Sequence, residues 1–229
     1  MTAFVLGATG FVGREVVRQL CARGRKTVAH VRPDSKSLAE WRGKLDALGA
    51  AVDTTPWDAA ALAARLCVLA PAQVYILIGT TRSRAKADAV AGNIYETIDL
   101  GLTKIAVDAA RAAENRPRLV YLSSVGADAS ARSAYLAARG RAEQVVTTSS
   151  LPWIIARPSI ITGERDEGRF GERGAAVVGD GLLAVAGVLG GKRLRDRYRS
   201  TTPDVLAAAL IRLGEAPDHD RIVDGADLR

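Results

Sequence analysis

A glycine-rich segment near the N-terminus has the residue types and spacing that suit a phosphate-bearing ligand. The string GATGFVG places Gly7, Gly10 and Gly13 directly after an apolar run and ahead of an amphipathic segment. This spacing lets the chain turn tightly at the first glycine, lets a pyrophosphate approach at the second, and lets a helix pack closely on the strand at the third. The N–H groups at the helix start would then face the anion. The segment predicts dinucleotide binding, and the alternative is a tight strand-to-helix turn that holds no ligand.

The residues after the second expected strand indicate which dinucleotide is bound. An acid at this point, about 20 residues past the glycines, would bind the adenosine ribose. The chain reads AHVRPD here, so Arg32 stands in the place of the acid. A guanidinium can hold a 2′-phosphate through paired hydrogen bonds and charge, and we therefore expect NADP(H) rather than NAD(H). Two alternatives stay open: Arg32 is one of many surface arginines, or Asp34 reaches the ribose.

A second group of residues has the types needed to move a proton at a carbonyl oxygen. Ser123 and Ser124 follow an expected strand, while Tyr135 and Arg139 are four residues apart on an expected helix and share one face. The phenol could pass a proton to a carbonyl oxygen beside a stabilising cation, and a serine hydroxyl could bind the same oxygen. In the alternative, Tyr135 packs on the sheet and Arg139 pairs with Glu143 one turn further along.

Short apolar runs that alternate with helical patterns indicate the elements that position these residues. We expect an α/β fold with a doubly wound parallel sheet, in which helices cover both faces. The expected strands span residues 2–6, 27–31, 50–53, 73–78, 118–122 and 152–157. The expected helices span residues 11–23, 36–48, 58–69, part of 86–114, 132–149, a segment near 174–189, and 203–213.

The chain is expected to form a single domain with a late insertion. Residues 1–158 would be a dinucleotide-binding core of the Rossmann type, and residues 159–229 a small C-terminal cap with closing helices. Ligands of open parallel sheets bind beyond the carboxyl ends of the strands. The cap would close over that edge and select the substrate.

Four strings of the sequence, taken in their order along the chain, resemble the short-chain dehydrogenase/reductase superfamily in its extended or atypical branch. The resemblance rests on GATGFVG, LSSVGAD, the Tyr-x-x-x-Arg pair and WIIARPSIITG, and it is strongest to the Tat-interacting-protein oxidoreductase group over residues 1–173. It implies an NADPH-binding Rossmann protein that uses a tyrosine and an upstream serine. The positions that match cofactor-binding residues are Gly7, Thr9, Gly10, Phe11, Val12, Gly13, Arg32, Gly79, Thr80, Arg139, Pro158 and Ile160. The positions that match catalytic residues are Tyr135, Arg139, and Ser123 or Ser124.

One departure from the family lies four positions after the tyrosine, where the family has Lys and this chain has Arg139. An arginine can hold the nicotinamide ribose and stabilise a phenolate, but it cannot join a proton relay because it does not lose its proton. We expect an NADP(H)-dependent oxidoreductase that acts on a small carbonyl, alcohol or sugar-like substrate. The alternative is a regulator or redox sensor that binds NADP(H) without turnover and presents a surface to a partner.

Composition and charge narrow the remaining classes. The 229 residues are 48% hydrophobic and 25% charged, which is ordinary for a globular protein. The basic run at 192–199 does not predict nucleic-acid binding, even with a net charge of +7, because Asp196 interrupts the run. The apolar segment 181–191 is too short to span a bilayer and leaves a homodimer contact open. Nothing at the N-terminus resembles a signal peptide, so we expect a cytoplasmic protein.

The cysteines and histidines do not predict a metal centre or a disulfide. Cys21 and Cys67 lie among apolar neighbours and are expected to be inert core thiols. His30 and His219 are far apart and belong to no ligand motif.

Overall fold

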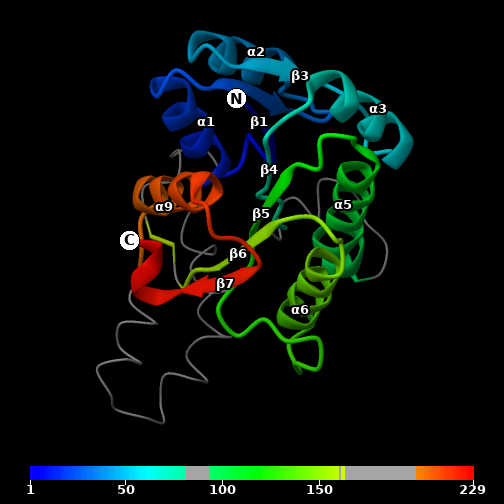
Figure 1. Cartoon of the computed structure of the whole chain (residues 1–229), viewed down its shortest axis with the longest axis vertical. Helices are drawn as coiled ribbons and strands as arrows, with labels where there is room; N and C mark the ends of the chain where they lie inside the picture. The colour runs from blue at the N-terminus through cyan, green and yellow to red at the C-terminus, as the bar shows by residue number, and fades with distance from the viewer. Residues whose placement is uncertain (81–92, 160, 163–199) are drawn as a thin grey trace.

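The computed structural model describes residues 1–80, 93–159, 161–162 and 200–229 and contains a seven-stranded sheet in which all paired strands are parallel (Figure 1). The strands lie in the order β3-β2-β1-β4-β5-β6-β7. Their bounds are β1 Thr2–Leu6, β2 Lys26–His30, β3 Ala51–Asp53, β4 Gln73–Ile76, β5 Arg118–Leu122, β6 Trp153–Arg157 and β7 Arg221–Asp224. The order reverses direction between β1 and β4, and a crevice for a ligand opens at such a switch point. The expected doubly wound sheet is confirmed.

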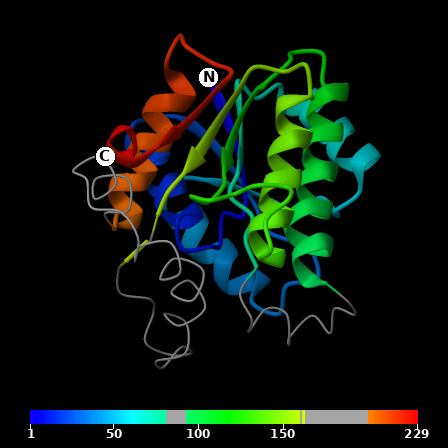
Figure 2. The same cartoon turned by 90° about the horizontal axis from the view of Figure 1, so that it is seen from below.

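Helices cover both faces of the sheet (Figure 2). On one face lie α1 (Gly13–Ala22), α2 (Leu38–Ala47) and α9 (Pro203–Glu215); on the other lie α3 (Ala59–Leu69), α5 (Thr103–Ala112) and α6 (Ala134–Thr147). Alternate strand residues feed the two cores because side chains of a strand point to opposite faces. Val5 and Val120 pack in the first core, whereas Phe4 and Tyr121 pack in the second. Burial on both faces explains why the central strands read as continuous apolar runs.

The structure adds a strand that the sequence analysis did not predict. β7 pairs with β6 and forms one edge of the sheet. Its residues RIVD give a weak signal because only Val223 is buried and Ile222 is 45% exposed. α9, which precedes β7, packs beside α1, and the two helices are joined by a 2.8 Å hydrogen bond from Gln19 Nε2 to the Asp204 carbonyl (Figure 1). The last part of the chain therefore belongs to the layers of the sheet.

The expected long helix within 86–114 takes a different form in its described part. A π-helix, η1 (Tyr95–Leu102), leads directly into α5, and a short 3₁₀-helix, η2 (Gly225–Leu228), ends the chain. π-helical turns are rare and frequently mark functional sites. The expected helix near 174–189 and the basic run at 192–199 lie outside the described residues.

Two further expectations concern cysteines and membranes. Cys67 is exposed on α3 and Cys21 is only half-buried on α1, so the prediction of two core thiols is wrong for Cys67. Among the helices that the structure describes, none combines the length and apolar character that crossing a membrane requires.

Candidate active site

The glycine turn between β1 and α1 has the geometry that its spacing predicts. Gly7 has φ +83°, and a Cβ there would lie 2.6 Å from the Leu77 carbonyl oxygen, so the turn excludes other residue types. A Cβ on Gly13 would lie 2.0 Å from the Gly7 carbonyl oxygen, because the start of α1 packs directly on the turn. The amide of Gly10 donates to the Gly7 carbonyl at 2.9 Å, which closes the turn.

The other members of the predicted phosphate loop differ in what they expose. Gly10 is exposed, and Thr9 and Phe11 are half-buried beside it. Val12 is buried in the core that α1 shares with the sheet, so its side chain belongs to the packing and only its backbone borders the turn.

Arg32 lies just beyond β2, on the same edge of the sheet as the glycine turn. Val31 extends the strand by donating to the Asp53 carbonyl at 2.9 Å, and the half-buried Arg32 follows. Arg32 Nη1 lies 3.7 Å from Asp34 Oδ2, so the two side chains that were alternatives for the ribose end of the cofactor form an ion pair.

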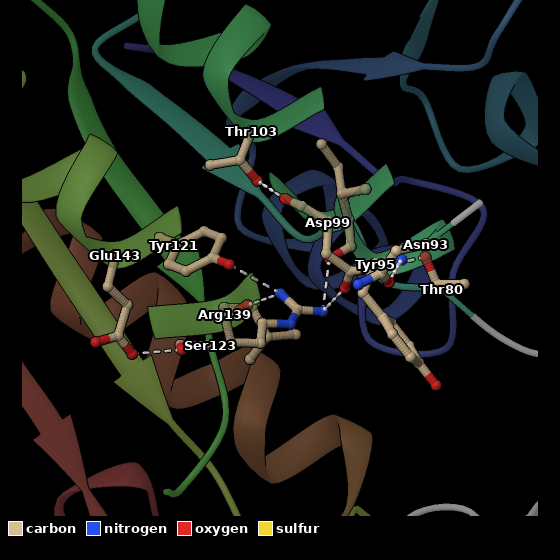
Figure 3. A network of polar contacts seen from close by, with 11 residues as sticks. Thr80, Asn93, Tyr95, Asp99, Thr103, Tyr121, Ser123, Arg139 and Glu143 are labelled. Atoms are coloured by element: carbon tan, nitrogen blue, oxygen red, sulfur yellow. Dashed lines mark hydrogen bonds and ion pairs between the residues drawn. The ribbon is translucent and has the colours of Figure 1, made fainter. Parts of the chain in front are cut away.

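Arg139 of α6 is buried between the carboxyl ends of β4 and β5 (Figure 3). Its Nη2 donates to the Ile78 carbonyl at 3.0 Å, and its Nη1 donates to the Leu122 carbonyl at 2.8 Å and to the Tyr121 hydroxyl at 3.1 Å. Nη2 also lies 2.8 Å from Asp99 Oδ1 in an ion pair. The sequence left a pairing of Arg139 with Glu143 open, but the structure pairs Arg139 with a different carboxylate.

Asp99 is the site residue that sequence reasoning missed. It lies in the middle of η1 and is 0% exposed. Its Oδ2 accepts from Thr80 Oγ1 at 2.5 Å, and its backbone carbonyl accepts from Thr103 Oγ1 at 2.6 Å (Figure 3). The one available signal is an aspartate within the otherwise apolar stretch IDLGL. Predicted cofactor residue Thr80 is therefore held by a carboxylate, and a Cβ on its neighbour Gly79 would lie 3.1 Å from Arg139 Nη2.

Burial and the neighbouring groups together set the protonation states of Arg139 and Tyr121. Burial lowers the pKa of Arg139, whereas Tyr121, Tyr135 and Asp99 raise it by a larger amount in total, so its pKa lies above the ordinary value. Burial raises the pKa of Tyr121, and the Arg139 cation opposes that rise. Arg139 is thus a permanent cation and Tyr121 a neutral phenol that accepts its hydrogen bond.

Tyr135 lies in the first turn of α6, next to Arg139. The Arg139 guanidinium carbon is 5.4 Å from the centroid of the Tyr135 ring, within the range of a cation–π contact. Tyr95, the first residue of η1, packs edge-on against Tyr135 with ring centroids 5.5 Å apart and an interplanar angle of 65°. The half-buried Tyr135 therefore has Arg139 and Tyr95 as neighbours. The contact with Arg139 is the one that their shared helix face predicts.

The two candidate serines after β5 have different partners. Ser123 is buried and donates its hydroxyl to Glu143, which Arg157 also binds through Nε at 2.9 Å and Nη2 at 2.5 Å. Ser124 is half-buried, and its hydroxyl makes a 3.3 Å contact with the Val125 carbonyl. The Ser123 hydroxyl is therefore already occupied by the Glu143 carboxylate of α6.

The predicted segment after β6 is described only in part. Pro158 is buried, and its carbonyl accepts from the Val125 amide at 2.9 Å, which joins this segment to the loop after β5. Ile160 lies outside the described residues.

The sequence and fold match known proteins over most of the chain. Residues 7–182 match a family of proteins described as NAD(P)H-binding. The chain belongs to the NAD(P)H-binding family. Two curated relatives are a protein named FMP52, mitochondrial, from Coccidioides immitis, 29% identical over 99% of this chain and 94% of the relative, and one named fmp52, mitochondrial, from Aspergillus niger, 31% identical over 92% and 85%. The crystal structure of the Bordetella bronchiseptica enzyme WbmH in complex with NAD⁺ has a TM-score of 0.68 and 17% identity over 99% of this chain and 77% of that one, and shows the shared fold alone.

Membership of the NAD(P)H-binding family confirms the expected class of cofactor and the Rossmann-type fold. It contradicts no site residue, but it does not distinguish NADP(H) from NAD(H). The prediction of a cytoplasmic protein is contradicted, because the six curated relatives are all named mitochondrial proteins. That prediction considered only a secretory pattern in the first residues, and such a pattern does not distinguish the cytoplasm from mitochondria.

A surface groove of about 460 Å³ runs between α6 and the β6–β7 edge, with Asp128, Gln144, Arg157 and Ile222 among its lining residues. These lining residues include neither Tyr135 nor the glycine turn. Within the described ranges, no three His, Cys, Asp or Glu side chains are grouped to hold a metal ion.

Proposed function

We propose that this protein is an NADP(H)-dependent oxidoreductase of the short-chain dehydrogenase/reductase type, related to the Tat-interacting-protein oxidoreductase group. Its substrate would be a small carbonyl, alcohol or sugar-like compound. The observation that carries the proposal is the contact of Tyr135 with the buried Arg139 cation at the carboxyl edge of the sheet, where the Gly7 turn also opens.

The cofactor site is supported by the glycine turn and by Arg32. The exposed Gly10 leaves bare backbone at the N-terminal end of α1, and backbone N–H groups at such an end favour a pyrophosphate. Arg32 adds a cation at the tip of β2 that suits a 2′-phosphate. When bound, the cofactor supplies the hydride for the substrate carbon.

The chain's own residues would handle the oxygen of the substrate. Tyr135 donates its hydroxyl proton to the carbonyl oxygen, and Ser124 donates a hydrogen bond to the same oxygen. Arg139 stabilises the resulting phenolate by charge. Because Arg139 holds its proton permanently, Tyr135 regains a proton from water, to which its half-buried ring has access.

The test is NADPH oxidation with a panel of aldehydes, quinones and diketones. We expect turnover by the wild-type protein and a loss of about a hundredfold or more in kcat for Tyr135→Phe, with NADPH affinity retained. Thermal unfolding of both proteins checks that the variant is folded. Equal rates for the two proteins would remove Tyr135 from the chemistry.

The second candidate function is a regulator that binds NADP(H) without turnover. It is favoured by the contacts of Arg139, whose two terminal nitrogens donate to two strand-end carbonyls and Tyr121 and pair with Asp99. Calorimetry would then detect NADPH binding, while the same carbonyl panel gives no NADPH oxidation. Affinity for a partner protein would change with the cofactor.

A further inference from the structure

Asp99 is a buried carboxylate that the proposed chemistry does not use directly. It is fully enclosed, yet its two carboxylate oxygens contact different elements: Oδ2 accepts from Thr80 after β4, and Oδ1 pairs with Arg139 of α6. A buried ion pair costs desolvation energy and is weak evidence for stability by itself. Because the pair lies next to Tyr135, the proposed catalytic residue, it could instead serve to position that residue's neighbours.

The pair sets the position of the cation that contacts Tyr135. Arg139 Nη2 is shared by Asp99 and the Ile78 carbonyl, while Nη1 binds the Leu122 carbonyl and Tyr121. The plane of the guanidinium is therefore fixed, with its central carbon 5.4 Å from the Tyr135 ring. Of these partners only Asp99 carries a charge opposite to that of Arg139, so it is the one that attracts the cation by charge.

η1 contacts Tyr135 by a second route. Tyr95, four residues before Asp99 on the same π-helix, packs edge-on against the Tyr135 ring. Tyr95 is itself held at the start of η1, where its amide donates to Asn93 Oδ1 at 3.1 Å. One π-helix thus supplies both the residue that fixes Arg139 and a ring that contacts Tyr135.

We propose that Asp99 is a positioning residue for Tyr135, which acts by holding the Arg139 guanidinium against the tyrosine ring. The kinetic part of this inference rests on the proposed function, whereas the geometric part does not. Without the carboxylate, the buried cation keeps only neutral acceptors, so we expect it to shift toward solvent and away from the Tyr135 ring. The competing explanation is that Asp99 only joins β4, η1 and α6.

Fluorine NMR of protein labelled with meta-fluorotyrosine separates these explanations without needing a substrate. The chain has five tyrosines, whose resonances are assigned by single Tyr→Phe variants. In Asp99→Asn we expect the Tyr135 resonance to shift, while that of Tyr75, buried in the core on the other face of the sheet, stays in place. An unmoved Tyr135 resonance, or equal shifts at Tyr75, overturns the inference.

A matched control is Asp53→Asn. Asp53 is also a buried carboxylate (4% exposed) paired with an arginine, 2.5 Å from Arg65 Nε, but it lies on the edge strand β3. It should leave the Tyr135 resonance and the activity unchanged. Should Asp99→Asn fail to fold, Thr80→Val removes the donor to Asp99 Oδ2 and is expected to give a smaller shift in the same direction.

Kinetics supply the second measurement. We expect Asp99→Asn to lower kcat by about tenfold to a hundredfold, as a slightly misplaced proton donor does, and to change kcat by a larger factor than the KM for NADPH. In a Tyr135→Phe background, Asp99→Asn should lower kcat no further, since it acts through that tyrosine. Additive losses would overturn the inference. If wild-type protein turns over no carbonyl, the proposed function fails, and the NMR result alone decides the role of Asp99.

Discussion

At the scale of single residues, the two serines after β5 differ in what their hydroxyls can still do. Ser123 donates to Glu143, whereas Ser124 makes only a 3.3 Å contact with a backbone carbonyl. We therefore expect Ser124→Ala to lower kcat for carbonyl reduction by about tenfold or more, because it removes a donor to the substrate oxygen. Ser123→Ala should lower the free energy of unfolding by about 1 kcal/mol and change kcat little. Steady-state kinetics and urea unfolding measure both, and the reverse pattern would assign the catalytic role to Ser123.

Local spacing predicted part of this site and could not predict the rest. Tyr135 and Arg139 are four residues apart on one helix, so their contact follows from helix geometry alone. The Asp99 pair with Arg139 depends instead on how η1 and α6 pack together. No local pattern carries that information, because the pair is far apart in sequence.

At the scale of elements, the packing of α1 on β1 depends on a missing side chain. A Cβ on Gly13 would lie 2.0 Å from the Gly7 carbonyl oxygen, and backbone atoms cannot yield as a flexible side chain would. We expect Gly13→Ala to lower the free energy of unfolding by about 1–3 kcal/mol, as overpacking does. The displaced turn should also weaken NADPH binding by about tenfold or more.

The control for that prediction is Gly43→Ala on α2, where a Cβ meets nothing within 4 Å. There we expect a gain of up to about 1 kcal/mol from higher helix propensity, with NADPH affinity unchanged. Thermal unfolding and calorimetric titration measure both variants. A Gly13→Ala protein that binds NADPH as well as the wild type would separate the turn from the cofactor site.

The elements that the sequence predicted are those with strong internal patterns. β1 and β4 are almost wholly buried and read as apolar runs, and α1 shows a clear apolar stripe. β7 has one buried residue among four, so its pairing with β6 comes from tertiary structure. The π-helical form of η1 was not predicted either, because the sequence analysis expected an ordinary helix within 86–114.

At the scale of the whole molecule, stability should fall in mild acid because of His30. This residue is 3% exposed, its Nε2 lies 2.7 Å from the Thr55 carbonyl oxygen, and burial lowers its pKa below the usual 6.5. Above pH 6.5, the ordinary pKa that applies to the unfolded chain, His30 is neutral in both the folded and the unfolded chain. Below it the unfolded chain takes up a proton that the folded chain does not, so the free energy of unfolding falls by up to about 1.4 kcal/mol per pH unit.

Urea unfolding at a series of pH values between about 7 and about 5 measures that loss. His30→Gln keeps a donor for the Thr55 carbonyl but does not titrate, so its stability should depend less on pH than that of the wild type. Identical curves for the wild type and His30→Gln would contradict the assignment.

Binding of the cofactor should stabilise the whole fold, and the choice of cofactor can be measured through that linkage. A ligand that binds only the folded state raises the free energy of unfolding by an amount that grows with its concentration relative to Kd. If Arg32 holds a 2′-phosphate, NADPH should raise the Tm more than NADH at equal concentration. Arg32→Ala should remove about 1.5–3 kcal/mol of the NADPH stabilisation and leave that of NADH unchanged. Arg42→Ala, at an exposed arginine of α2, serves as the control.

The outcome that would contradict this prediction involves Asp34, the acid that forms an ion pair with Arg32 at the tip of β2. A larger effect of NADH, lost in Asp34→Ala, would show that the acid binds the ribose and would overturn the preference for NADP(H).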